Sequence, residues 1–132
     1  MKTISHTIIF TCLAFAQLLG QVSKQDSTQG LKDFYKNYFI MGAAVSPQAL
    51  KGPEADLVVK HFSSITAENA MKMGPIHPEE NRYNWAPADE IVNFSQANGL
   101  KMRGHTLCWH NQAPDWLFKD GNGNQVTKEV LL

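Results

Sequence analysis

The feature that most restricts the fold is an alternation of short apolar runs, each of strand length, with longer segments of helical spacing. The strand-like runs are residues 39–45, 63–66 and 100–107. Between them lie two helical segments whose first turns, residues 53–56 and 87–90, carry proline and acidic residues, as helix starts prefer. Strand, helix, strand, helix, strand is the order of parallel α/β units. We therefore predict an α/β fold with a parallel sheet.

Two further segments complete the predicted pattern. Residues 31–38 place Leu31, Phe34, Tyr35 and Tyr38 at the spacing of one helical face. Residues 74–83 are polar and hold two prolines, so we predict a loop there.

The first part of the chain has the composition of an export signal. A positive start at Lys2 is followed by an uncharged apolar run, residues 7–20, which is shorter than the roughly 20 residues of a membrane span. We predict a signal peptide over residues 1–20 and a polar linker over residues 21–30. An earlier cleavage after Ala16, a lipoprotein anchored through Cys12 and a buried N-terminal helix are the alternatives. The expected location is extracellular, secreted or periplasmic, without membrane association after cleavage.

The charge distribution limits the classes of partner that the chain can bind, and the cysteine content limits its disulfide bonds. The 12 basic and 12 acidic residues give a formal net charge of zero, and the basic ones are scattered. This distribution argues against a nucleic-acid partner and favours a small molecule or a neutral polymer. Beyond the predicted signal, Cys108 is the single cysteine, so an internal disulfide is excluded there.

A first group of candidate binding residues follows the second predicted strand. Glu68, Asn69 and Lys72 place a carboxylate, an amide and an ammonium where barrel enzymes keep their substrate-binding groups. Charge-assisted hydrogen bonds from such groups are about twice as strong as neutral ones. The alternative is a Glu68–Lys72 ion pair four residues apart on an exposed helix, worth roughly 0.2–0.5 kcal/mol.

A second group, His105, Trp109 and Gln112, lies at the end of the third predicted strand. An indole offers a flat apolar face to a sugar ring, while imidazole and amide groups can form hydrogen bonds with its hydroxyl groups. Core packing is the alternative for Trp109. Zinc binding by His105, His110 and Cys108 is a weak alternative because no HExxH pattern occurs, so we predict no metal site.

Other polar and aromatic residues are interpreted as structural. We expect the aromatic side chains near the helices to fill a core. They are Tyr83, Trp85, Trp116 and Phe118. Glu79 and Glu80, an adjacent carboxylate pair in the predicted loop, are expected to be solvated surface residues without an apolar pocket to raise either pKa.

Three segments together resemble a known family. Residues 39–44, 66–72 and 103–110, with residues 81–89 between them, are similar to the glycoside hydrolase family 10 endo-1,4-β-xylanases. The resemblance implies a (β/α)8 TIM barrel, which takes about 250 residues. Residues 31–132 would then supply the N-terminal part, about the first three β/α units.

The resemblance also implies a substrate and a role for each candidate residue. Xylan and xylo-oligosaccharides are the implied partners, with no cofactor and a monomer when full length. Glu68, Asn69 and Lys72 match family residues that bind xylose on the glycone side of the cleaved bond. His105, Trp109 and Gln112 match residues that line the subsite where the bond is broken.

The implied reaction is retaining hydrolysis by two glutamates roughly 5–5.5 Å apart. The family carries them on its fourth and seventh strands, so both are expected beyond Leu132 and no catalytic residue is assigned. The 132-residue polypeptide is therefore expected to be inactive and poorly soluble. The alternatives are a non-catalytic xylan- or oligosaccharide-binding fragment and another barrel β-glycanase.

Overall fold

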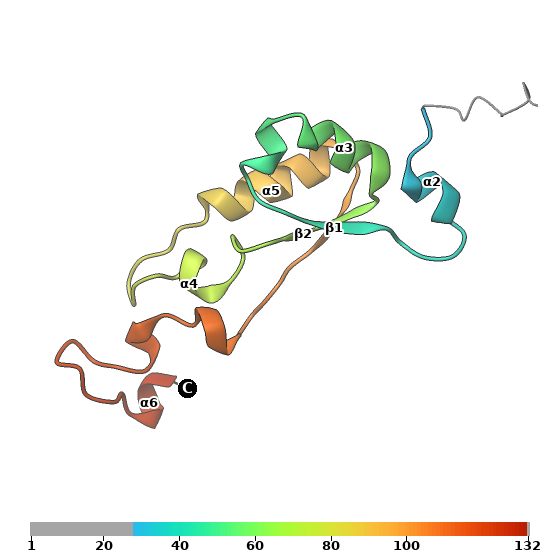
Figure 1. Cartoon of the computed structure of the whole chain (residues 1–132). Coiled ribbons are helices and arrows are strands. Elements are labelled where there is room, and N and C mark those ends of the chain that lie inside the picture. Colours follow the sequence, from blue (N-terminus) through green and yellow to red (C-terminus); the bar gives the residue numbers. More distant parts are fainter. Residues whose placement is uncertain (1–27, 132) are drawn as a thin grey trace, which may run out of the picture.

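A parallel sheet of three strands forms the centre of the part of the chain that the computed structural model describes, residues 28–131 (Figure 1). The strands are β1 (Gly42–Val45), β2 (Ser64–Ala67) and β3 (Lys101–Arg103), in the order β1-β2-β3. This arrangement confirms the predicted α/β pattern. The predicted signal peptide and residues 21–27 of the predicted linker lie outside the described residues.

Short helices connect and follow the strands. The α-helices are α2 (Leu31–Tyr35), α3 (Glu54–His61), α4 (Met73–Ile76), α5 (Ala86–Ala97) and α6 (Lys128–Leu131). Single 3-10 turns are η1 (Ala49–Lys51), η2 (His110–Gln112) and η3 (Asp115–Leu117). Within the described residues, no helix is long and apolar enough to cross a membrane.

Local sequence explains where the two longer helices begin and end. Pro53 is the N-cap of α3, and Pro87 lies in the first turn of α5, where its missing N–H costs no helical hydrogen bond. At the other end of α5, Gly99 adopts φ +63°, a left-handed conformation that favours glycine. The chain can therefore turn directly from α5 into β3.

One face of the sheet packs against the helices to form the core. Register places Ala43, Ile65 and Met102 side by side on this face. Ile65 of β2 and Ile91 of α5 are both 0% exposed and belong to one apolar cluster with Val58 of α3. Strand and helix therefore share a single core.

The opposite face of the sheet is open in the described part of the chain. Ala44, Thr66 and Arg103 are aligned across the three strands on this face. Together with neighbouring residues they line a hollow of about 510 Å³.

Two predicted elements are longer in the sequence pattern than in the structure. The third strand was expected over residues 100–107, but β3 ends at Arg103, where its pairing with Thr66 of β2 is the last of the ladder. The helix expected over residues 31–38 ends at Tyr35. Its predicted apolar face stays exposed, and Tyr35 instead stacks on Phe39 at a ring separation of 5.1 Å.

The prediction of a loop over residues 74–83 is wrong at its start. Met73–Ile76 forms the one-turn helix α4, in which Pro75 occupies a first-turn position that tolerates proline. The turn is closed by the Ile76 N–H donating to the Lys72 carbonyl oxygen (3.1 Å).

The position of Ile65 in the core predicts how much stability is lost when its side chain is shortened. Ile65→Ala in the full-length protein should lower the free energy of unfolding by about 2–5 kcal/mol, because it leaves a cavity between β2 and the helices. Leu57→Ala is the matched control, since Leu57 on α3 is 57% exposed. Urea unfolding followed by tryptophan fluorescence measures both, and equal losses would contradict the proposed core.

Candidate functional site

The ends of β2 and β3 bring the two predicted groups of binding residues to the same edge of the sheet. Parallel pairing aligns Thr66 with Arg103, and each strand ends within one residue of this pair. The Glu68 N–H still donates to the Val45 carbonyl oxygen (2.9 Å), after which the chain bends. Residues 68–72 and 104–112 therefore start from neighbouring strand ends.

Asn69 joins these two segments. Its side-chain oxygen Oδ1 accepts one hydrogen bond from Lys72 Nζ (2.9 Å) and another from Gln112 Nε2 (3.1 Å). Two donors on one oxygen fix the orientation of the amide. The two Asn69 Nδ2–H groups have no acceptor within residues 28–131, so they remain able to donate to a ligand.

Lys72 carries a positive charge that is held without an anion. The residue is only 8% exposed, and its Nζ lies 4.6 Å from the centroid of the Trp109 ring. A cation over an indole face is attracted by the ring's electrons. This cation–π interaction contributes about 2 kcal/mol where water is excluded. Among the described residues Lys72 forms no ion pair. Its remaining N–H donors therefore have no protein acceptor there.

The alternative of a Glu68–Lys72 helical ion pair is wrong for this structure. Residues 68–72 form bends and a turn rather than a helix. The ion pairs seen in the described part of the chain include Lys51 with Glu90 and Arg82 with Glu79, and neither involves Glu68 or Lys72. Glu68 is exposed at the rim, and its carboxylate has no partner among residues 28–131.

Gln112 is the residue of the segment after β3 that contacts Asn69. It ends the turn η2, and its backbone oxygen lies so close to Gly74 of α4 that a methyl group there would approach it to 3.0 Å. Its side-chain oxygen Oε1 is buried and has no hydrogen-bond partner in the described residues. Such an acceptor is costly to leave unpaired.

The structure brings four of the six predicted site residues into contact with one another, whereas Glu68 and His105 form no hydrogen bond with these four side chains. Asn69, Lys72, Trp109 and Gln112 form a connected cluster. Half-buried His105 makes no hydrogen bond to this cluster, and with residues of α4 and α5 it lines a separate pocket of about 330 Å³.

The expected aromatic core is wrong in the described part of the chain. Tyr83 and Trp85 are 56% and 52% exposed, and Phe118 is also exposed. Tyr83 instead stacks between His77 (ring centroids 4.0 Å apart) and Trp85 (5.3 Å). These rings lie over the loop after α4, outside the apolar cluster of the sheet.

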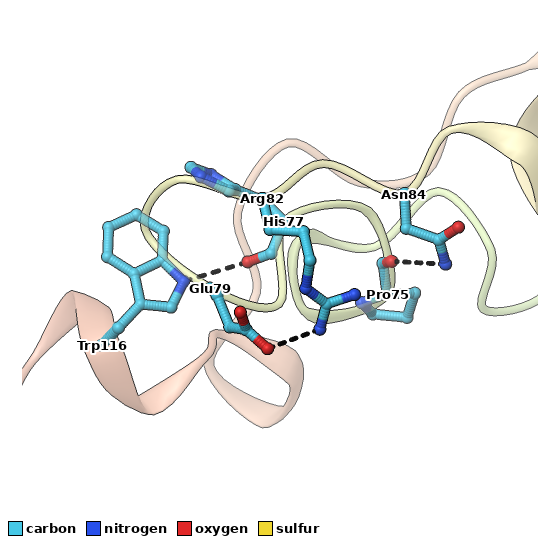
Figure 2. A network of polar contacts seen from close by, with 6 residues as sticks. All are labelled: Pro75, His77, Glu79, Arg82, Asn84 and Trp116. Carbon is cyan, nitrogen blue, oxygen red and sulfur yellow. Dashed lines mark hydrogen bonds and ion pairs between the residues drawn. The ribbon is translucent and has the colours of Figure 1, made fainter.

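Trp116, also assigned to the core, makes a polar contact. Its Nε1–H donates to the His77 carbonyl oxygen (3.0 Å), and Figure 2 shows the indole of η3 directed at the loop that follows α4. Sequence analysis did not connect this residue with the site. The available signal was its position four residues after Gln112.

The adjacent carboxylates Glu79 and Glu80 are both exposed, as predicted. Arg82 Nη2 donates to Glu79 Oε1 (2.7 Å), and this bond, together with the guanidinium charge, holds the pKa of the Glu79 carboxyl below its usual value (Figure 2). A carboxyl group that serves as a general acid near neutral pH needs the opposite shift. Glu79 is therefore unsuited to that role.

Within residues 28–131, no three His, Cys, Asp or Glu side chains lie close enough to hold a metal ion. Cys108 is free and exposed.

Comparisons with known proteins point to one family. Residues 30–131 match the sequence profile of Glycosyl hydrolase family 10. The chain is 53% identical over 103 residues to an endo-1,4-beta-xylanase/feruloyl esterase of Xylanibacter ruminicola, covering 77% of this chain and 14% of that relative.

Two crystal structures show the same likeness. An endo-1,4-beta-xylanase from Caldicellulosiruptor owensensis is 50% identical with a TM-score of 0.72, covering 78% of this chain and 31% of the other. An intracellular xylanase from Thermoanaerobacterium saccharolyticum, solved as a mutant with xylotriose, is 41% identical with a TM-score of 0.75, covering 81% and 34%. The chain thus spans about a third or less of these proteins. The likeness confirms the predicted fold class, the first β/α units of a TIM barrel.

The hydrogen bonds of Asn69 lead to a stability prediction. Asn69→Ala should lower the free energy of unfolding of the full-length protein by roughly 1.5–3 kcal/mol, because it leaves the buried Lys72 ammonium without its acceptor. Asn69→Asp keeps an acceptor oxygen and should lose much less. Thermal and urea unfolding measure the difference, and an Asn69→Ala variant as stable as the parent would contradict this role.

Proposed function

Because the chain belongs to glycosyl hydrolase family 10, we propose that it is part of a retaining endo-1,4-β-xylanase and that its strand ends bind xylose units of xylan. The observation that carries the proposal is the cluster of Asn69, Lys72, Trp109 and Gln112 at the adjoining ends of β2 and β3. Substrate-binding groups of barrel enzymes lie at this end of the strands.

The cluster offers what a neutral sugar needs. The free Nδ2–H groups of Asn69 and the unengaged N–H groups of Lys72 donate to sugar oxygens, and the exposed carboxylate of Glu68 accepts from hydroxyls. The Trp109 ring adds an apolar face for the C–H side of a pyranose. In our proposal Glu68, Asn69 and Lys72 bind on the glycone side, and His105, Trp109 and Gln112 border the cleaved bond.

We further propose that the two catalytic glutamates come from sequence beyond these 132 residues. Retaining hydrolysis needs one carboxyl group with a raised pKa beside a second carboxylate, roughly 5–5.5 Å away. The pKa of Glu79 is lowered by Arg82, and Glu80 is exposed on the same loop. Neither belongs to the Asn69 cluster.

Export remains a proposal that rests on the first residues of the sequence. The positive start and the uncharged run over residues 7–20 are the supporting features. The Thermoanaerobacterium neighbour is described as intracellular, so family membership does not decide the location of this chain. N-terminal sequencing of the mature protein tests cleavage after residue 20.

The proposed activity predicts a preference for xylan over cellulose and a loss of activity when Lys72 is replaced. The full-length protein should release reducing sugar from xylan much faster than from cellulose. Lys72→Met should lower kcat/KM on xylan by about 10–100-fold, because one charge-assisted hydrogen bond to substrate is lost. Lys51→Met is the matched control, since exposed Lys51 pairs with Glu90 away from the cluster and should leave kcat/KM unchanged.

Faster hydrolysis of cellulose would favour another β-glycanase. Binding of xylotriose without hydrolysis by the full-length protein would favour a non-catalytic xylan-binding role. A Lys72→Met variant with the parent's kcat/KM would contradict the role of the cluster in substrate binding.

The isolated polypeptide of residues 1–132 is predicted to release no reducing sugar from xylan, because our proposal places both catalytic carboxylates elsewhere. The assay needs the fragment produced in a host without xylanases. Activity that co-purifies with the fragment through two different columns would contradict the proposed origin of the glutamates.

A further inference from the structure

We propose that Trp116 is a positioning residue that holds the Gln112 side of the site against Asn69. The inference starts from the hydrogen bond of its Nε1–H to the His77 carbonyl oxygen (3.0 Å), which links η3 to the loop after α4 (Figure 2). The indole also lies tilted against the His77 ring, with centroids 4.5 Å apart. Trp116 therefore contacts His77 by both its ring and its N–H group.

The loop that receives Trp116 is closed on itself, so it is a firm support. The Asn84 N–H donates to the Ile76 carbonyl oxygen (2.7 Å), and Asn84 Nδ2 donates to that of Pro75 (3.4 Å). His77 Nε2 donates to the Glu80 carbonyl oxygen (2.9 Å), and the His77 ring stacks on Tyr83. These bonds fix the carbonyl group to which Trp116 donates.

A second contact brings the same two segments together at Gly74. There the backbones of α4 and η2 approach so closely that a methyl group on Gly74 would lie 3.0 Å from the Gln112 carbonyl oxygen. Gln112 is thus held between two anchors, the Gly74 contact at its own backbone and the Trp116 bond four residues later. In this position its Nε2 donates to Asn69 Oδ1 (3.1 Å).

The consequence concerns the orientation of the Asn69 amide. Gln112 Nε2 and Lys72 Nζ both donate to the Asn69 oxygen, which leaves the Nδ2–H groups without an acceptor among the described residues. Loosening the Trp116 bond would let Gln112 withdraw and the Asn69 amide rotate. The effect on sugar binding rests on the function proposed above, whereas the effect on geometry does not.

The experiment measures xylotriose affinity by calorimetry on the full-length protein. Trp116→Phe keeps an aromatic ring against His77 and removes the N–H donor, and it should weaken binding by about 2–10-fold. Gly74→Ala should weaken binding in the same direction by displacing the Gln112 backbone. In a Gln112→Leu background, Trp116→Phe should cause no further loss, because its effect is transmitted through Gln112.

Matched controls separate positioning from general damage. Leu57→Ala truncates an exposed side chain on α3, and Gly121→Ala adds a methyl group where no atom of the described residues lies within 4 Å. Both should bind xylotriose as the parent does. An unchanged affinity of Trp116→Phe, or a loss that is additive with Gln112→Leu, would overturn the proposal.

A crystal structure of Trp116→Phe tests the geometry without any ligand. We expect the separation of Gln112 Nε2 and Asn69 Oδ1 to exceed about 3.5 Å, beyond hydrogen-bond range. A retained bond would overturn the positioning role. If the parent protein fails to bind xylotriose, the proposed function fails, and this distance alone decides the role of Trp116.

Discussion

The parallel pairing of β2 with β3 is the constraint on which the rest of the site depends. It aligns Ile65 with Met102 on the buried face and Thr66 with Arg103 on the open face. Because the strands run in the same direction, the segments that follow them leave from one edge of the sheet. Asn69 and Gln112, which are 43 residues apart in the sequence, can therefore share a hydrogen bond. A one-residue slip in register would exchange the two faces and separate these side chains.

The environment of Lys72 supports the proposal that this edge of the sheet binds sugar. A buried ammonium is usually paired with a carboxylate. Here an amide oxygen and an indole face surround it, and the described part of the chain gives it no ion pair. Its charge is therefore not neutralised by a neighbouring anion, and its N–H groups keep their strength as donors. Sugar hydroxyl oxygens can accept hydrogen bonds from such donors.

Sequence alone was sufficient for the strand order and for finding most of the residues that cluster at the strand ends, because both depend on local patterns. Proline and acidic residues marked the starts of α3 and α5, and polar residues directly after a strand identified Asn69 and Lys72. What sequence did not provide depends on contacts between distant segments. The Trp116–His77 bond spans 39 residues, and the length of β3 depends on its pairing with β2. The exposure of Tyr83 and Trp85 was likewise unpredictable, because hydrophobicity alone does not determine where a ring packs.

The central claim is that the cluster at the ends of β2 and β3 binds xylose units. The most direct test is a crystal structure of the full-length protein with xylotriose. We predict a xylose unit against the Trp109 ring, with Asn69 Nδ2 and Lys72 Nζ each donating to a sugar oxygen at about 2.7–3.2 Å. Xylotriose bound elsewhere, with these groups facing only water, would contradict the account.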